Sequence, residues 1–401
     1  MGLKGTAALV GYAENKPEKI PLGGSRETNL EMCADLAWRA LSDAGISMRD
    51  VDGMVISYID ESDMFIPSTV SEYLGTRLGY AERVDLGGAC SAGMIWRAAA
   101  AIELGMARVV LCLAPAAFHL TPDGIPNQVM AWLRFGASSY NYGSPQAQFD
   151  IPYGHVGQNA LYAMFAQRYA HCHGYDPRAM ARMVVQLRQN ACANPDAFFY
   201  GKPLTEDDVL NSPMIARPLH LLEIVMPVTG GAAVVVADAQ VARFSSHRPV
   251  WVTGCGESLM TKSPHYADDM LETPIGPASQ KAFNMAGIGP ADIHAAQIYD
   301  CYSITVLLTL EDAGFCPKGE GMRFLREHNF TWTGDFPMNT NGGQLSFGQP
   351  GVAGGMSLVI EAARQIMGRG ETRQIKRCDN VYVSGTGGIM SEQVALILQG
   401  D

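Results

Sequence analysis

The chain has 401 residues, of which 47% are hydrophobic and 17% are charged, and its formal net charge is −11. This length predicts two domains or one duplicated domain, and the composition is that of a folded globular protein. The acidic balance excludes a broad basic surface for nucleic acid, and no apolar run approaches the roughly 18 to 20 residues that a membrane-spanning helix needs.

The cysteines and the start of the chain bear on location. The nine cysteines include no CxxC pair, which favours reduced thiols over a disulfide framework. No basic segment followed by an apolar one opens the sequence, so no secretory signal is evident. We therefore expect a cytoplasmic protein with neither a nucleic-acid partner nor a membrane partner.

One pattern occurs twice along the chain. An amphipathic stretch ends at Ala44-Gly45-Ile46 and leads through a short loop into an apolar strand over residues 53–57. The same arrangement recurs at Ala286-Gly287-Ile288, before a strand over residues 295–299. A glycine directly after a helical pattern is typical of a helix C-terminus. The constant spacing of the matched residues predicts a duplicated unit.

Each copy continues through a glycine-rich turn, a helix and another strand, over residues 86–114 and 341–384. Strands that alternate with helices predict parallel sheets covered by helices on both faces. The sequence therefore predicts an α/β protein built from two similar halves.

A region with different composition separates the two copies. Residues 120–220 are rich in aromatic, proline and polar residues, and we expect an inserted loop domain there that is helical from Gln158 to Tyr169. Long insertions on a rigid scaffold often cover a binding site. The expected division is an N-terminal half at 1–119 and 221–245 and a C-terminal half at 246–401.

Cys90 is the first candidate for chemistry. It follows Gly87-Gly88-Ala89 and directly precedes an alanine-rich helix. The positive end of the helix dipole and the unpaired N–H groups there favour a thiolate, and a thiolate is a nucleophile. A small buried cysteine at a tight strand-helix junction is the alternative interpretation.

Four segments together resemble the thiolase superfamily. Cys90 in its glycine turn resembles the acylated cysteine of thiolases and ketoacyl synthases. Three further segments are similar to the sterol carrier protein 2-type branch: Tyr299-Asp300-Cys301-Tyr302 to its His-Asp-Cys-Phe block, Asn339 to Gly351 to its Gly-His-Pro block, and Val383 to Gly388 to its closing glycine turn. The segments run in the expected order over nearly the whole chain.

The resemblance implies the thiolase fold, in which two duplicated βαβαβαββ halves form five alternating layers (αβαβα), here with the inserted loop domain. It implies an acyl-coenzyme A substrate, with coenzyme A as a substrate and no metal in this chain. It also implies a homodimer paired through the sheet edge of the first half, and a small zinc-ribbon/OB-fold partner subunit.

The departures from the family pattern concern the site itself. Tyr299 stands where the branch has the histidine of His-Asp-Cys-Phe, and Gln349 stands where it has the histidine of Gly-His-Pro. Ser384 occupies the position of a cysteine that other thiolases carry in the last glycine turn. Cys301 retains the acid/base thiol of the branch.

The favoured hypothesis is a thiolase-type acyltransferase that cleaves or forms the C–C bond of a bulky 3-oxoacyl-CoA through an acyl-Cys90 intermediate, in metabolism resembling β-oxidation. Cys301 would move the proton, and Gln349 would donate hydrogen bonds to an oxyanion. The resemblance implies a supporting oxyanion or backbone role for Asn341 and Gly388. Ser384 is an accessory candidate.

Two alternatives remain open. Some members of the branch are retro-aldol lyases on 3-hydroxyacyl-CoA esters of the steroid side-chain type, and they resemble this chain in carrying tyrosine where thiolases have histidine. Tyr299 would then deprotonate the 3-hydroxyl, without a covalent cysteine. The third hypothesis is a non-catalytic thiolase-like subunit that binds acyl-CoA.

The remaining candidates carry weaker signals. His155, in the insertion, is an accessory candidate that would supply an imidazole to the pocket, and His119 has similar status. His171-Cys172-His173 looks like a metal cluster, but adjacent residues point in different directions, so we expect no metal site there. Aromatic residues of the insertion hint at a bulky acyl group: Tyr140, Tyr142, Phe149, Tyr153 and Tyr162.

Overall fold

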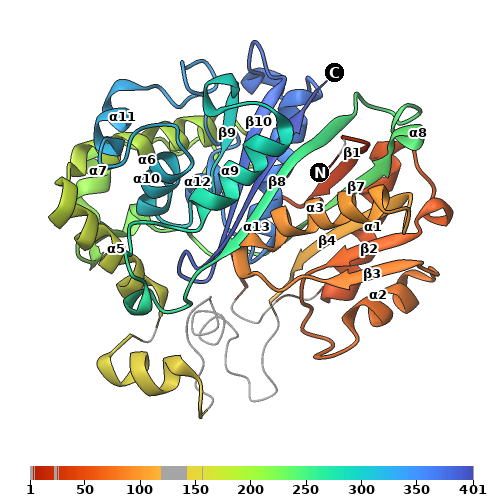
Figure 1. Cartoon of the computed structure of the whole chain (residues 1–401), viewed down its shortest axis with the longest axis horizontal. Coiled ribbons are helices and arrows are strands. Elements are labelled where there is room, and N and C mark those ends of the chain that lie inside the picture. The colour runs from red at the N-terminus through yellow and green to blue at the C-terminus, as the bar shows by residue number, and fades with distance from the viewer. Residues whose placement is uncertain are drawn as a thin grey trace.

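The computed structural model describes residues 3, 5–21, 25, 27–118, 142–155 and 157–400. Within them, one nine-stranded sheet is built from β1 (Ala7–Glu14), β2 (Gly53–Ile56), β3 (Tyr80–Arg83), β4 (Val109–Ala116), β7 (Gly230–Asp238), β8 (Val250–Leu259), β9 (Ala295–Gln297), β10 (Asn380–Gly387) and β11 (Glu392–Gln399). The strand order is β3-β2-β4-β7-β1-β8-β11-β10-β9 (Figure 1).

The strand order confirms the duplication. The neighbours β2-β4-β7-β1 of the first half have the same order and directions as β9-β10-β11-β8 of the second half. The two halves meet at β1 and β8 through the residue pairs Ala8–Trp251 and Leu9–Val250. The repeated sequence pattern therefore corresponds to a repeated topology.

The expectation of purely parallel sheets is wrong. Only β2–β3, β2–β4 and β9–β10 pair in parallel, and the other neighbouring pairs are antiparallel. The physical reason is plainest at β10 and β11, because a tight turn joins Gly387 to Glu392. So short a connection can only return the chain antiparallel to itself.

Four long helices complete the layers: α1 (Asn29–Ala44), α3 (Cys90–Glu103), α9 (Ile275–Ala286) and α13 (Ala353–Ile366). Helices α3 and α13 contact each other and contact strands of both halves, so they form the central layer. Helix α1 covers the outer face of β1, β7 and β4, and α9 covers β8 and β11. The five layers of the thiolase fold are confirmed.

Sequence signals account for the helix ends. Thr28 caps α1 through a capping box with Glu31, which satisfies N–H groups that have no partner within the helix. Helices α1 and α9 end at Gly45 and Gly287, with φ of 72° and 70°. Side chains disfavour that left-handed conformation, so the predicted glycine stops are confirmed.

The inserted region contains α5 (Gln158–His173), α6 (Pro177–Cys192), α7 (Glu206–Asn211) and the small pair β5 (Met214–Ala216) and β6 (Leu219–His220). The helix predicted from Gln158 is α5, and it continues to His173. Together with α10 (Ser303–Asp312) and α11 (Gly321–Glu327), these helices gather at the end of the molecule opposite α1 and α2 (Ile66–Leu74) (Figure 1). No helix in the described ranges is long and apolar enough to cross a membrane.

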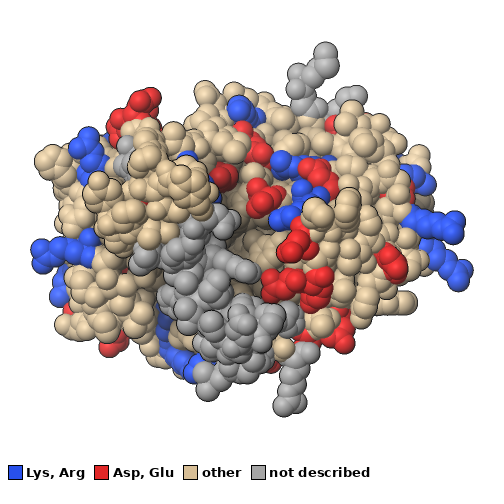
Figure 2. Space-filling view, turned by 90° about the horizontal axis from the view of Figure 1, so that it is seen from below, with Lys and Arg blue, Asp and Glu red and all other residues tan. Residues whose placement is uncertain are grey.

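The surface carries charges of both signs. In the middle of the face in Figure 2, Lys and Arg side chains lie beside Asp and Glu side chains. Exposed pairs such as Arg323–Glu320, at 3.0 Å, contribute little to stability because water screens them. Ion pairs in the interior are less screened by water and hold their groups more firmly in place.

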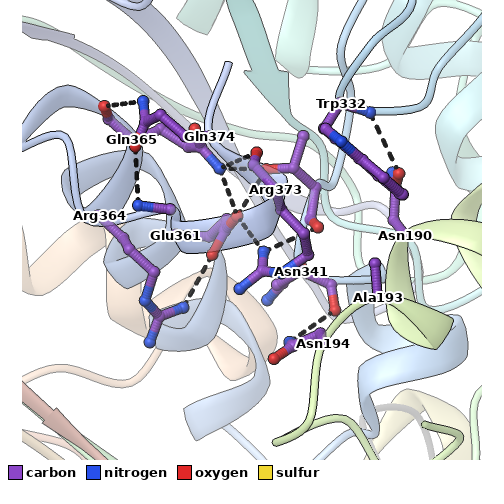
Figure 3. Close-up of polar contacts among 12 residues, drawn as sticks. Asn190, Ala193, Asn194, Trp332, Asn341, Glu361, Arg364, Gln365, Arg373 and Gln374 are labelled. Carbon is purple, nitrogen blue, oxygen red and sulfur yellow. Dashed lines mark hydrogen bonds and ion pairs between the residues drawn. The ribbon is translucent and has the colours of Figure 1, made fainter.

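One such interior cluster centres on Glu361 of α13 (Figure 3). Its carboxylate accepts hydrogen bonds from Arg373 at 2.6 Å, Thr340 at 2.6 Å and Arg364 at 2.8 Å. Burial acts to raise the pKa of Glu361, but the guanidinium groups of Arg373 and Arg364 outweigh it and hold the pKa at about 2. Glu361 is therefore an ionised structural group.

This cluster clamps the loop that follows residue 338. Arg373 also donates to the Thr340 carbonyl at 2.9 Å, while Asn194, just after the end of α6, donates to the Asn341 carbonyl at 3.0 Å. Within the loop, Asn339 makes two hydrogen bonds to the backbone of Ile298, at 2.7 and 2.8 Å. The clamp therefore fixes the residue next to Tyr299.

Candidate active site

The two central helices begin beside each other. Cys90 opens α3 and Ala353 opens α13, and the Ser91 hydroxyl donates to the Val352 carbonyl at 2.8 Å. A Cβ on Gly355 would lie 2.8 Å from the Gly88 carbonyl, so the two chain turns are in close contact. The glycine turn of the first half and the Gly-Gln-Pro block of the second half thus meet, as the family resemblance implies.

Tyr299 and Gln349 form a direct pair at this junction. Tyr299 follows β9, and its phenol oxygen accepts a hydrogen bond from Gln349 Nε2 at 3.0 Å. Its backbone N–H donates to Ser384 Oγ of β10 at 2.9 Å. Burial, and then the neighbouring Cys301, raise the pKa of Tyr299, whereas the bond from Gln349 opposes the rise. The pair that replaces the two family histidines is therefore neutral and hydrogen-bonded.

Gly88 provides the space for this phenol. A Cβ at position 88 would overlap both the Tyr299 hydroxyl and the Thr386 carbonyl of β10. Any side chain there would displace Tyr299 or the strand. The glycine turn before Cys90 therefore serves the residue at 299 as well as the helix start.

Cys301 lies between two hydroxyl groups. Its thiol donates to Tyr162 Oη of α5 at 3.5 Å and lies 3.6 Å from Thr305 Oγ1 of α10. Tyr162 in turn donates to the Gly388 carbonyl at 3.2 Å. Burial raises the pKa of Cys301 to about 11, and the two hydroxyl groups act in the opposite direction. Cys301 is therefore a protonated thiol at neutral pH, suited to donating a proton.

Cys90 is bound by its own turn. Its sulfur accepts the Leu86 N–H at 3.1 Å, and its thiol donates to the Val84 carbonyl at 3.4 Å. Burial raises the pKa of Cys90 to about 12, although the Leu86 N–H opposes the rise. Burial thus favours the thiol form of Cys90 in this arrangement, against the expected thiolate, and the nucleophile role of Cys90 stays a prediction.

The remaining candidates from the sequence are Asn341, Gly388, Ser384 and His155. The Asn341 side chain accepts the Gly343 N–H at 2.9 Å and donates to the Ser357 carbonyl at 3.5 Å, so it shapes the loop. His155 is half-buried, and its Nδ1 has no hydrogen-bond partner among the described residues. The roles assigned to Asn341, Gly388, Ser384 and His155 stay predictions.

The aromatic residues of the insertion divide sharply. Tyr142, Phe149 and Tyr153 are exposed, whereas Tyr162 is buried in the site. Tyr140 and His119 lie outside the described residues. His171, Cys172 and His173 are all exposed, and no group of three metal-ligating side chains is found in the described part of the chain.

Sequence reasoning named Tyr162 only as one aromatic residue among five, and it did not name Thr305. Thr305 lies in the first turn of α10, which begins two residues after Cys301, and the sequence carries no clear signal for this contact. No local signal identifies Tyr162, because its place in the site depends on how α5 packs against α10.

Comparisons with known proteins identify the family of the chain. The family model described as Thiolase C-terminal domain-like matches residues 256–400. The chain is 32% identical to a steroid side-chain-cleaving aldolase of Thermomonospora curvata, over 96% of each chain. It is also 32% identical to the 17-hydroxy-3-oxo-4-pregnene-20-carboxyl-CoA lyase of Mycobacterium tuberculosis, over 96% of this chain and 97% of the relative.

Among solved structures, that of the Ltp2-ChsH2(DUF35) aldolase superposes with a TM-score of 0.86 at 30% identity. The match covers 100% of this chain and 99% of that one. The chain thus shares nearly a third of its residues with these relatives and its fold with the solved structure, and it belongs to the thiolase superfamily, in the sterol carrier protein 2-type thiolase-like branch.

Proposed function

We propose that this protein is a retro-aldol lyase that cleaves the C2–C3 bond of a 3-hydroxyacyl-CoA. The observation that carries the proposal is the Tyr299–Gln349 hydrogen bond in place of the two histidines that activate a thiolase cysteine. The two 32%-identical relatives, named as an aldolase and a lyase, support the same choice. The acyltransferase hypothesis therefore becomes the second candidate.

The reaction breaks one C–C bond and moves one proton. In one coupled step the C3 hydroxyl passes its proton to the Tyr299 oxygen, the Tyr299 phenol proton passes to the Cys301 sulfur, and the Cys301 thiol proton passes to C2. The hydroxyl oxygen becomes a ketone or aldehyde carbonyl, and C2, which has enolate character as the C2–C3 bond breaks, becomes part of the shortened acyl-CoA. The proton that leaves oxygen equals the one that arrives on carbon, so no co-reactant is required.

The high pKa values fit a proton relay better than a resting phenolate. Burial raises the pKa of Tyr299 and of Cys301, so both begin as neutral groups. As the C2–C3 bond breaks, Tyr299 therefore receives the hydroxyl proton while its own proton replaces the one that Cys301 gives to the substrate carbon. Gln349 donates to the Tyr299 oxygen throughout and so stabilises negative charge on it.

The enolate oxygen needs hydrogen-bond donors and a positive field. The N-termini of α3 and α13, each 14 residues long, converge at the junction. Unpaired N–H groups and the helix dipole favour an anion there. This reaction uses the helix terminus at Cys90 for its field and leaves the Cys90 thiol without a covalent role.

The second candidate is thiolysis through an acyl-Cys90 intermediate. It is favoured by the presence of Cys90 at the first position of α3. It requires the Cys90 thiol to lose its proton without a histidine nearby to accept it. A subunit that only binds acyl-CoA is the third.

The name of one solved structure supports a partner subunit for this chain. The structural neighbour is named as an aldolase with a second component, ChsH2(DUF35). We propose that this chain also binds a small subunit, of the zinc-ribbon/OB-fold class, and forms a homodimer through β3, the edge strand of the first half. A mass in solution equal to one chain alone, with or without such a subunit, contradicts the assembly.

A paired assay tests the reaction. The purified chain is incubated with a 3-hydroxyacyl-CoA that has a fully substituted C3, and with the 3-oxoacyl-CoA plus free coenzyme A. Liquid chromatography with mass detection should find a ketone and the shortened acyl-CoA from the first substrate only. Cleavage of the 3-oxo ester with an acyl adduct on Cys90 would instead establish the thiolase; cleavage of neither ester, with the partner subunit present, would favour the binding subunit.

A further inference from the structure

Tyr162 joins the inserted region to the site. It lies on α5, yet its side chain is buried against the second half of the fold, 1% exposed. Its hydroxyl donates to the Gly388 carbonyl at 3.2 Å and accepts from the Cys301 thiol at 3.5 Å. A phenol from the insertion therefore contacts the thiol that the proposed reaction uses as its acid.

The ring of Tyr162 is fixed, while its hydroxyl hydrogen can rotate. The ring stacks on Tyr302 with centroids 4.0 Å apart and planes 20° apart. Tyr302 is held by its own hydroxyl, which donates to Asn159 Oδ1 at 2.6 Å, one turn before Tyr162 on α5. The hydroxyl can point either to the Gly388 carbonyl or to the Cys301 sulfur without movement of the ring.

We propose that Tyr162 is a positioning residue that orients the Cys301 thiol and stabilises the negative charge that develops on its sulfur during proton transfer. The role rests on the proposed function, in which the S–H bond of Cys301 breaks as the C–H bond at C2 forms. Rotation about the Tyr162 C–O bond then moves its O–H from the Gly388 carbonyl to the sulfur. Tyr299 returns the proton, and Tyr162 ends as it began.

The surroundings of the thiol show why a donor is required. The titratable groups that face Cys301, besides Tyr162, are Tyr299, Asp300 and Tyr302. Burial and Asp300 disfavour a thiolate, and the hydroxyls of Tyr162 and Thr305 favour it. A hydrogen bond to the charged form lowers a pKa, so the loss of Tyr162 Oη should make the thiolate harder to form.

The test compares two buried tyrosines of the same helix. Tyr162→Phe removes the contact with Cys301, and Tyr169→Phe removes a matched buried bond, that from Tyr169 Oη to Glu311 at 2.5 Å. The rate of iodoacetamide alkylation at Cys301 is followed against pH by peptide mass spectrometry, with the exposed Cys172 as an internal reference. This measurement needs no substrate.

We expect Tyr162→Phe to slow alkylation of Cys301 by roughly fivefold to tenfold near pH 9, a rise of up to about one pKa unit. Alkylation of Cys172 should not change. In turnover of the 3-hydroxyacyl-CoA, kcat should fall about tenfold while KM stays within about twofold, because the contact matters after substrate is bound. Tyr169→Phe should change neither measurement.

Three results would overturn the proposal: unchanged labelling of Cys301 in Tyr162→Phe, an equal change in Tyr169→Phe, or no labelling of Cys301 in the unmodified chain up to about pH 10. In the last case a small reagent cannot reach a thiol that must meet a substrate carbon. If labelling changes as expected but no ester is cleaved, the Tyr162–Cys301 coupling stands and the retro-aldol proposal fails.

Discussion

Two buried regions of the second half shift the pKa values of their ionisable groups in opposite directions. Glu361 is fully buried and has two guanidinium groups within 2.8 Å, and its pKa is lowered to about 2. Tyr299 and Cys301 are also buried, but their neighbours are hydroxyl, thiol and amide groups and the carboxyl group of Asp300, and burial raises the pKa of both. Equal burial therefore yields a permanent charge in one region and neutral, transferable protons in the other.

The comparison shows how the two regions depend on each other. The charged cluster fixes the loop at Thr340, and Asn339 of that loop fixes Ile298 beside Tyr299. A buried ion pair with complete partners gives a rigid support, while a site without cations keeps its protons available. Substitutions in the charged cluster should therefore act mainly on stability, and substitutions at Tyr299 or Cys301 should act mainly on catalysis.

Tyr299→Phe should have the largest effect. Removal of the phenol oxygen removes the proton acceptor, and a general base contributes about 10² to 10⁴-fold to rate, so we expect a loss of about a thousandfold in kcat. Tyr382→Phe is the matched control, because it removes another buried hydroxyl, bonded to Ser279 at 2.7 Å. Equal losses in the two variants would mean that the effect is structural.

Glu361→Gln should break the charged region without touching the reacting groups. Loss of the carboxylate leaves Arg373 and Arg364 short of a counter-charge, which should lower the free energy of unfolding by roughly 3 to 5 kcal/mol in urea titrations. Glu320→Gln, in the exposed pair with Arg323, should have no measurable effect.

The pH dependence of this contribution has a definite sign. The folded pKa of Glu361, about 2, lies below its ordinary 4.5. The stabilisation is therefore complete above about pH 4.5 and is lost as the pH falls towards 2, and the variant should lack this loss. An identical acid unfolding curve would contradict the assignment.

Asp300→Asn should change the pH dependence of stability, with a smaller effect than Glu361→Gln. Burial raises the pKa of Asp300 from 3.8 to about 7, although Gln344 N–H donates to it at 2.7 Å. Because the folded pKa is raised, stability is greatest below pH 3.8 and falls as the pH rises through 7. The unmodified chain should lose about 2 kcal/mol between about pH 5 and pH 7, and the variant should lose less. Parallel curves would show that Asp300 does not titrate in this range.

Cys90→Ala should have the smallest effect. Under the proposed reaction the thiol has no covalent role, so kcat should stay within about threefold of the unmodified chain. Loss of two weak sulfur hydrogen bonds should lower the free energy of unfolding by about 1 kcal/mol. A complete loss of turnover in a folded variant would favour the acyl-Cys90 mechanism.

Sequence patterns predicted the parts of the fold that depend on local chemistry. The glycines at 45 and 287 end their helices as predicted, and the blocks around Tyr299 and Gln349 meet as the resemblance implied. These features follow from backbone conformation and from the order of family segments.

Long-range packing explains what the sequence did not predict. The pKa of Cys90 depends on how completely the surrounding chain excludes water, which no neighbouring residue reveals. The position of Tyr162 depends on the packing of α5 against α10, and the antiparallel strands depend on turns whose length is clear only once the strand ends are known.

Gly88 determines the space that is available to the side chain at position 299. The Thr386 carbonyl excludes a Cβ at position 88, whatever residue stands at 299. The backbone at Thr386 therefore requires glycine at 88, and the absent side chain leaves the space that the Tyr299 hydroxyl occupies. A shorter ring at 299, as in a Tyr299→His variant, would leave this space in place, so an exchange between the two rings requires no companion substitution at 88.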